Sequence, residues 1–536
     1  MRSRRRRVPA LVAAVVCTVV LATACTGSST PSGPGGTADS FTFALPAAPI
    51  SLDVVKDFVG NTMQVVAPVT EKLELVSETG EVSPGLAASV AEPDPTTLVY
   101  TLRPDVRFSD GAPLTSDDVV WSLKHAADTA AGAQTAGNIT WIESVTATGP
   151  LEVTVRTTQP VPNARGSIAV VGFVQQAAFG RAHPEDLGTP AASPVGTGPY
   201  RIAANTPDRI TLERNPHFRG PAPRVATIHF TFIPQDNSAQ LAMRSGALQG
   251  AVASNLKTVD QWRAIPGTTP YEMPSLYTTF LTMDTTTAPL DDVHVRRAIA
   301  HSVDRAGVLS AGYGSYATLL RGLAPPGLLA SVAPSTDAVD AFLDGLPQYD
   351  LDPAAARDEL ARSAYPQGFT LDVPVITGNP ASELVVQNLA RNMAGLGVTI
   401  TPRPVTSSQW TSTVYAHGDD IGMQTMALVP SIPDPSSVLG AVTGRENIRP
   451  QGFNLANWSP PAAEEAFRRL ETSTDRAQRW EASQVLLRGI AEEVPYLPLF
   501  GLNTVAVLGD GFTFDRPPGF FDLYINGSWV HALTAG

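Results

Sequence analysis

Cysteine is nearly absent from this chain of 536 residues, since only Cys17 and Cys25 occur. Both lie at the N-terminus, and everything that follows them is free of cysteine. The body therefore has no intramolecular disulfide and depends on packing for its stability. Apolar runs long enough to span a membrane are also missing from the body, which indicates a soluble domain structure.

Motifs of hydrolytic and metal-dependent enzymes are missing as well. The sequence contains no Gly-x-Ser-x-Gly turn, no His-Glu-x-x-His zinc helix, no Cys-x-x-Cys pair and no EF-hand loop. Its eight histidines are scattered, and no two of them are four residues apart. His417, beside Asp419 and Asp420, comes nearest to a metal-ligating cluster, but this composition is also typical of a solvated loop. We therefore predict no catalytic residue, no metal site and no cofactor.

Positive charge is in deficit, because the formal net charge at pH 7 is −13. Five of the arginines are Arg2 and Arg4–Arg7, and removal of these first residues would take the charge from −13 to −18. An acidic surface repels nucleic acids and anionic membranes. We expect no nucleic-acid partner, and contact with the membrane only through an anchor.

The N-terminus has the organisation of an export signal. The basic residues are followed by the apolar run Val8–Ala22, which has about the length of a signal-peptide core. The sequence LATAC resembles the lipobox that precedes a lipidated cysteine, which predicts a signal peptide over residues 1–24 and lipid on Cys25. The alternative is a plain cleavage site with an incidental cysteine. Residues 25–38 are rich in Gly, Ser, Thr and Pro and predict a flexible tether.

Residues 100–126 carry the clearest local pattern. Apolar residues from Tyr100 to Phe108 predict two short strands, and Asp110-Gly111 predicts a turn whose glycine tolerates positive φ. Thr115 and Asp118 have the spacing of a helix N-cap with an acidic first turn, so a helix should begin near Ser116. These features describe a scaffold and carry no chemistry of their own.

The order of residues in this stretch resembles the signature sequence of the large solute-binding proteins of ABC importers, the peptide- and nickel-binding group. Its characteristic run is LR..V.F.DG.P.T..DV..S. Further segments resemble the family in the same order, and the resemblance extends from about residue 40 to about residue 510. The segments are SPVGTGPYRI (193–202), LERNPHF (212–218), PLDDVHVRRAIAHSVDR (289–305) and RWEASQVLLRGIAEEVPYLPLF (479–500).

The resemblance implies a bilobal α/β fold of the periplasmic-binding-protein type, in its large three-segment form (type II), with mixed sheets and hinge strands. A chain of this length is in any case too long for a single core. Lobe I is expected to be discontinuous, and a small extra domain and lobe II are expected to be continuous. The expected ranges are 39–75, 190–275 and 505–536 for lobe I, 76–189 for the extra domain and 276–504 for lobe II.

Candidate ligand-binding residues gather in one part of the expected lobe II. Aromatic residues and methionines there suit a cleft that accepts varied side chains, and ordinary core packing is the alternative for each. The loop PSIPDPSSVL resembles the family's cleft loop, with Asp434 before the proline. The candidates are Tyr277, Trp410, Tyr415, Ser431, Asp434, Asn454 and Trp458.

Two charge anchors of the family's peptide binders have no counterpart in this sequence. Ser431 stands where those proteins carry an acid that pairs with the α-ammonium group of the ligand. The loop Ile376–Asn379 lacks the arginine that receives the carboxylate of a dipeptide. Because a buried ammonium without a counter-charge is costly, we expect free dipeptides to bind weakly and longer, capped or uncharged ligands to be preferred.

The predicted function is an extracytoplasmic solute-binding lipoprotein, anchored to the outer face of the cytoplasmic membrane. It would act as a monomer that delivers a peptide or peptide-like ligand to the permease and ATPase subunits of an ABC importer. Two alternatives share the fold: an envelope lipoprotein without a transport role, glycolipid-related or regulatory, and a binder of a non-peptide solute.

Overall fold

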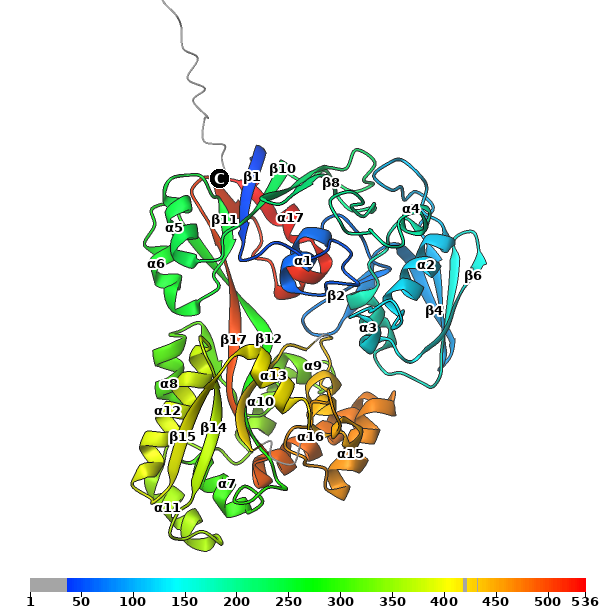
Figure 1. Ribbon diagram of the computed structural model, residues 1–536. Coiled ribbons are helices and arrows are strands. Elements are labelled where there is room, and N and C mark those ends of the chain that lie inside the picture. Colours follow the sequence, from blue (N-terminus) through cyan, green and yellow to red (C-terminus); the bar gives the residue numbers. More distant parts are fainter. Residues whose placement is uncertain (1–35, 418–421, 431) are drawn as a thin grey trace, which may run out of the picture.

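Two long strands join the two lobes of the protein. The computed structural model describes residues 36–417, 422–430 and 432–536. Strands β12 (Thr269–Met283) and β17 (Tyr496–Leu508) run from the upper lobe into the lower lobe (Figure 1). They pair antiparallel along their length, with a register shift between Pro274 and Tyr277. Since both lobes share these strands, a change of backbone angle at the shift can move one lobe against the other.

The largest sheet has nine strands and passes through both lobes. In lobe I, β17 pairs with β11, and the sheet continues through β1 and β10 to β9 and β8. In lobe II, β12 pairs with β16, and β13 pairs with β17. Strand β1 is parallel to β10 and β11, whereas the other pairs are antiparallel, which makes the sheet mixed. The bounds are β1 Ala38–Leu45, β8 Tyr200–Thr206, β9 Arg209–Arg214, β10 Val225–Phe232, β11 Gly250–Val252, β13 Ala317–Leu319 and β16 Met423–Leu428.

Lobe I is completed by the C-terminus of the chain. The indole of Trp529 contacts the rings of Phe41, Phe43 and Phe230, with ring centroids 5.8–6.5 Å apart. The backbone of Gly36 bonds with that of Ala535, so the two ends meet at one edge of the lobe. The remaining elements are α1 Gly60–Val66, β2 Glu74–Val76, α5 Asp236–Arg244, η2 Leu256–Thr258, α6 Val259–Arg263, β18 Phe512–Phe514, η5 Asp522–Asn526, α17 Trp529–Ala532 and β19 Leu533–Ala535.

A small domain of four antiparallel strands and three helices stands beside lobe I (Figure 1). Helix α2 begins at the predicted Ser116, and the Asp118 carboxylate accepts the Thr115 backbone N–H at 2.9 Å. The second strand predicted near Phe108 does not form, because that segment closes on itself through one isolated bridge. The sheet and helices are β4 Ala87–Asp94, β5 Thr97–Leu102, α2 Ser116–Ala126, β6 Ile142–Gly149, β7 Glu152–Thr157, α3 Ala164–Val171 and α4 Ala177–Ala182, and the segment also contains β3 Val82–Pro84, which pairs with β2, and the 3₁₀ turn η1 Ala136–Asn138.

Lobe II is mainly helical and contains a parallel strand pair, β14–β15, linked by helix α12. A separate buried apolar cluster fills the space between this unit, β12 and β17. The helices are α7 Val293–Ala300, α8 Arg305–Gly312, α9 Pro326–Ala330, α10 Thr336–Asp344, α11 Pro353–Arg362, α12 Pro380–Ala394, α13 Ser407–Val414, η3 Ser436–Gly440, α14 Ala441–Thr443, η4 Arg445–Asn447, α15 Pro461–Thr472 and α16 Arg476–Glu493. The strands are β14 Thr370–Ile376 and β15 Thr399–Val405.

The predicted segment boundaries fall at recognisable points of this fold. Residues 276 and 504 lie within β12 and β17, beside the register shift where the chain crosses between lobes. Residue 76 ends β2, and residue 190 follows the last helix of the small domain. The division into three segments remains our interpretation of these positions.

The Gly-Thr-Gly turn before β8 is explained by close approach of two backbones. A side chain at Gly196 or Gly198 would overlap the backbone at Pro68 and Val69, and the Gly198 N–H donates to the Val69 carbonyl oxygen at 2.9 Å. Only glycine allows the returning chain to lie this close to the first segment. Within the described part of the chain, no helix has both the length and the apolar character needed to cross a bilayer.

Candidate ligand-binding cleft

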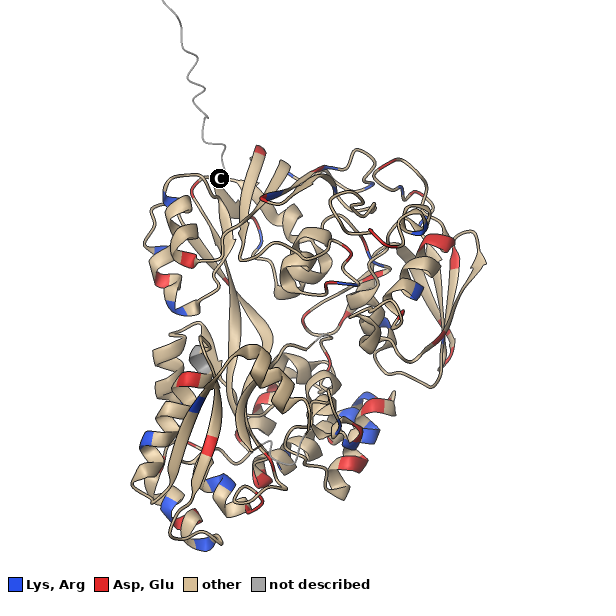
Figure 2. Ribbon diagram, viewed as in Figure 1, with Lys and Arg blue, Asp and Glu red and all other residues tan. Residues whose placement is uncertain are grey.

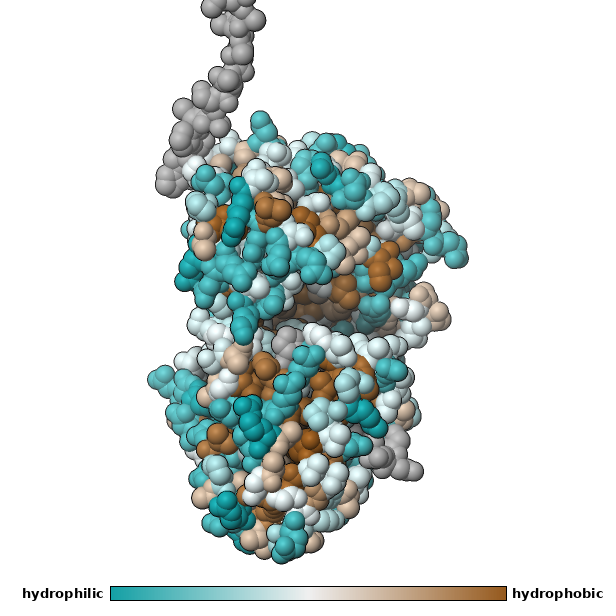
Figure 3. Space-filling model, turned by 60° about the vertical axis from the view of Figure 1, so that its left-hand side comes forward, coloured by the Kyte–Doolittle hydropathy of each residue, from teal (hydrophilic) through white to brown (hydrophobic). Residues whose placement is uncertain are grey.

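A cavity of about 520 Å³ lies between the small domain and lobe II. Two further cavities, of about 270 and 370 Å³, share Pro162 and Asn163 with it and extend it along the edge of the small domain. We call these three connected cavities the interlobe cleft. Figure 3 shows the waist between the lobes as a hollow, with hydrophobic residues along its upper margin. An elongated cleft of this volume has room for an extended ligand.

The lobes touch each other at one end of the cleft. Gly80, in the turn between β2 and β3, has a φ of 81°, and a Cβ at this position would lie 2.8 Å from the Pro433 carbonyl oxygen and 3.4 Å from the Ser331 Cβ. Gly80 lies at the start of the segment that forms the small domain, whereas Ser331 and Pro433 belong to lobe II. The structure therefore has the lobes in contact at this point.

Asp434 is bound inside lobe II. Its carboxylate accepts two hydrogen bonds from the Arg479 guanidinium on α16, at 2.7 and 2.9 Å, and a third from the Ser436 backbone N–H. The side chains of Asp434 and Arg479 are 3% and 8% exposed. This pair ties the loop after β16 to α16, and it neutralises the charge of the predicted ligand-binding aspartate. The helices α15 and α16 carry both acidic and basic residues (Figure 2).

The polar side-chain atoms of Asn454 and Trp458 also form hydrogen bonds within lobe II. The Asn454 amide donates to the carbonyl oxygens of Gly444 and Trp458 and accepts the hydroxyl of Tyr496, and it has no exposed surface. The indole N–H of Trp458 donates to the Glu493 carboxylate at 2.7 Å. These bonds fix the shape of the lobe II wall, which makes both residues supports of the cleft.

An aromatic row connects two of the predicted residues to the cleft. Trp410 meets Tyr415 edge to face at 5.6 Å between ring centroids, and Tyr415 meets Phe453 in the same way at 5.4 Å. Trp410 is buried, Tyr415 is half-buried, and Phe453 lines the cavity with 38% of its surface exposed. Phe453 is therefore the member of the row that a ligand can touch in this arrangement.

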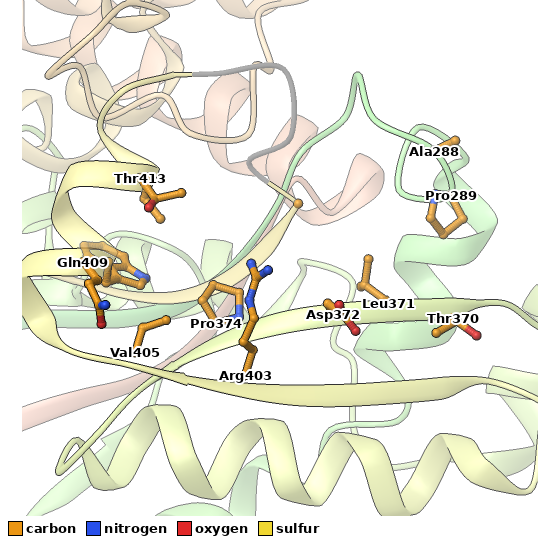
Figure 4. A pocket seen from close by; sticks show the side chains of 13 residues that line it. Ala288, Pro289, Thr370, Leu371, Asp372, Pro374, Arg403, Val405, Gln409 and Thr413 are labelled. Carbon is orange, nitrogen blue, oxygen red and sulfur yellow. The ribbon is translucent and has the colours of Figure 1, made fainter.

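A second cavity, of about 670 Å³, lies within lobe II and away from the small domain. Figure 4 shows Asp372 and Pro374 of β14 beside Arg403 of β15, with Gln409 and Thr413 of α13 at one side. Trp410 lines this cavity. Because its walls come from one lobe, closure of the two lobes would not enclose a ligand there.

The remaining predicted residues lie at the hinge or outside the described residues. Tyr277 is half-buried on β12, next to the register shift, where burial raises the pKa of its hydroxyl. Ser431 and Cys25 lie outside the described residues, as do Asp419 and Asp420 of the cluster considered with His417. Among the described residues, no three His, Cys, Asp or Glu side chains are grouped closely enough to hold a metal ion.

Sequence reasoning missed three cleft-lining residues: Trp141 of the small domain, and Phe467 and Glu471 of α15. Burial raises the pKa of Glu471 to about 7, and the negative charge of Asp434 adds to this effect. In the sequence, Glu471 is one of several charged residues on an amphipathic helix. The only signal in the sequence was its position near the C-terminal end of α15, where the helix dipole disfavours an acid.

The chain is similar to proteins that bind solutes outside the cell. The sequence profile of the bacterial extracellular solute-binding proteins, family 5 Middle, matches residues 81–449. A putative ABC transporter peptide-binding protein of Brucella abortus is 24% identical over 441 residues, or 79% of this chain and 80% of the relative.

Solved structures share the fold at low sequence identity. The substrate-binding protein CtaP of Listeria monocytogenes matches with a TM-score of 0.80 and 18% identity, covering 93% of this chain and 99% of that one. DppA of Helicobacter pylori, solved with the peptide STSA, matches with a TM-score of 0.74 and 17% identity, covering 93% and 98%. The predicted α/β periplasmic-binding-protein fold is thereby confirmed.

Two lobes, shared strands and a cleft between them define an extracytoplasmic solute-binding protein. The family profile covers more than half of the sequence, and the chain belongs to family 5 of the bacterial extracellular solute-binding proteins. The family predicted from the sequence motifs is confirmed. Solute-binding proteins of ABC importers work with permease and ATPase subunits.

Proposed function

We propose that this protein binds a peptide or peptide-like ligand in the interlobe cleft and delivers it to the permease of an ABC importer. The observation that carries the proposal is the row of three connected cavities between the small domain and lobe II. The largest of the three combines the aromatic side chains of Trp141, Phe453 and Phe467 with polar groups, as is typical of a cleft that accepts varied side chains, whereas small, polar and charged residues line most of the other two. The peptide-binding names of the Brucella and Helicobacter relatives support the same ligand class.

The ligand class is tested with protein purified from its native host without denaturation. Mass spectrometry of the released small molecules is expected to find peptides or peptide-like compounds, and calorimetry is expected to show that tri- to pentapeptides bind. Phe453→Ala is expected to weaken this binding by about fivefold or more, because an exposed aromatic wall is lost. Leu351→Ala, an exposed apolar residue between α10 and α11, is the control. Recovery of a sugar or metal complex alone would contradict the peptide assignment.

We further infer that the protein is anchored by lipid at Cys25. The basic N-terminus, the short apolar run and the flexible tether support this anchor. A fatty-acid probe added to growing cells is expected to label the wild-type protein and the Cys17→Ala variant, because Cys17 lies in the removed signal. Cys25→Ala is expected to lose the label and to leave the membrane fraction. Equal labelling of Cys25→Ala and wild type would refute the anchor.

A further inference from the structure

The carboxylate of Glu471 lies against Gly440 of lobe II, where the missing side chain of the glycine leaves room for it. It lies one residue before the end of α15 and lines the cavity of about 520 Å³. A side chain at Gly440 of η3 would overlap Oε1 of Glu471. Phe467, one helical turn earlier on the same face of α15, lines the same cavity. The carboxylate and an aromatic ring are therefore presented side by side.

Among the described residues, no hydrogen-bond donor or cation pairs with Glu471, and no hydrogen bond contributes to its pKa. The other acids of α15 are partnered, since Glu464 accepts the Ser459 hydroxyl and Glu465 pairs with Arg468. The nearby cation Arg479 is held by Asp434. A half-buried carboxylate without a partner is costly, and at a helix C-terminus the dipole adds to the cost.

The charges around the cavity are unbalanced. Glu446 and Glu471 are acidic, while the single basic residue in its wall, Arg479, is neutralised by its own aspartate. Across the cleft, the small domain contributes only uncharged residues to this cavity. They are Gly137, Asn138, Thr140, Trp141, Val161, Pro162, Asn163 and Ser167. The cavity therefore offers negative charge with no counter-charge from either wall.

We infer that Glu471 receives a cationic group of the ligand, such as the free amino end of a peptide, in the interlobe cleft. This inference rests on the proposed function and specifies its ligand further. An ammonium group would supply the missing hydrogen-bond donors, and the rings of Phe467 and Trp141 suit the chain next to it. The sequence-based expectation of weak binding by free amino ends considered only the positions that the family uses, whereas Glu471 comes from a different element.

The pH dependence of binding follows from the ionisation of Glu471. Burial and Asp434 raise its pKa to about 7, Arg479 opposes this shift, and Glu446 adds to it. A cationic ligand binds the ionised carboxylate, so lowering the pH through 7 makes binding compete with protonation. Affinity for such a ligand is expected to fall about tenfold between pH 7 and pH 5.5, where α-amino groups stay protonated. An acetylated ligand is expected to show no such loss.

The test compares two libraries of C-terminally amidated tetrapeptides with uncharged side chains, which differ only in a free or acetylated amino end. Wild type is expected to prefer the free ends. Glu471→Gln is expected to weaken binding of free ends by about 10- to 100-fold, as for loss of a charge-assisted hydrogen bond, and to spare acetylated ends. It should also abolish the pH dependence. Glu465→Gln, on the same helix and outside the cleft walls, is the matched control and should behave as wild type.

The outcomes separate the inference from the proposed function. If Glu471→Gln is folded, judged by its melting temperature, and binds both libraries as wild type does, then the inference is wrong while the proposed function stands. If wild type prefers acetylated ends, the inference is likewise wrong. If neither library binds to wild type, the proposed function is overturned together with the inference.

Discussion

Asp434→Ala is expected to lower the free energy of unfolding by about 3 to 5 kcal/mol, because it leaves the Arg479 guanidinium buried without its counter-charge. The two side chains are almost completely enclosed and share two hydrogen bonds of 2.7 and 2.9 Å. Urea denaturation monitored by circular dichroism measures the change, with the slope of the transition checked for two-state behaviour.

Two comparisons make this prediction specific to the buried pair. Asp515→Ala removes an ion pair with Arg224 whose side chains are 45% and 37% exposed, and it is expected to cost less than about 1 kcal/mol. The double variant Asp434→Leu with Arg479→Met removes both charges and is expected to recover most of the lost stability. A loss for Asp434→Ala as small as that for Asp515→Ala would show that solvent reaches the pair.

A disulfide between Gly80→Cys and Ser331→Cys is expected to hold the lobes in contact and to slow ligand release by about two orders of magnitude or more. The Cβ positions are 3.4 Å apart, close to the separation in disulfides. Release requires the cleft to open, and the crosslinked protein must first have its disulfide reduced or rearranged, which takes minutes to hours. Release is measured by chasing a fluorescent peptide with unlabelled ligand.

Several controls accompany the crosslink. The body has no other cysteine, so mispairing is limited, and Cys25 carries the expected lipid. Each single cysteine variant sets the reference rate of release, because cysteine at Gly80 costs about 1 to 2 kcal/mol of stability for its positive φ and places its Cβ 2.8 Å from the Pro433 carbonyl oxygen. Reductant should restore release in the double variant. Fast release from the fully oxidised protein would show that ligand leaves without separation of Gly80 from Ser331.

Local chemistry made parts of the fold predictable from the sequence. The start of α2 at Ser116 could be predicted because Thr115 and Asp118 form a capping box, and the two residues are only three positions apart in the sequence. The remaining architecture was predicted from the resemblance of the sequence motifs to the family. The prediction of a second strand near Phe108 was wrong. A strand needs a neighbouring strand to pair with, but the one bridge that this segment makes joins Arg107 to Pro113 of the same segment, and the sequence does not show this.

The residues of the cleft were harder to predict than the fold. Segments far apart in the sequence form the walls of the cleft, so the sequence near a residue does not show whether it lines the cleft. Asp434 was chosen from its place in the loop, but Arg479 reaches it from 45 residues away and neutralises it. Asn454 has the polarity of a ligand-binding residue, yet its bonding groups are taken up by Gly444, Trp458 and Tyr496. The prediction of Ser431 lies outside the described residues, and its role stays a prediction.

The meeting of the two chain ends in lobe I has a consequence for biogenesis. Strand β1 is made early in synthesis, yet its Phe41 and Phe43 contact Trp529, which is made much later. Lobe I can therefore complete its core only after β1 and the segment around Trp529 have both been made, because these contacts join residues far apart in the sequence.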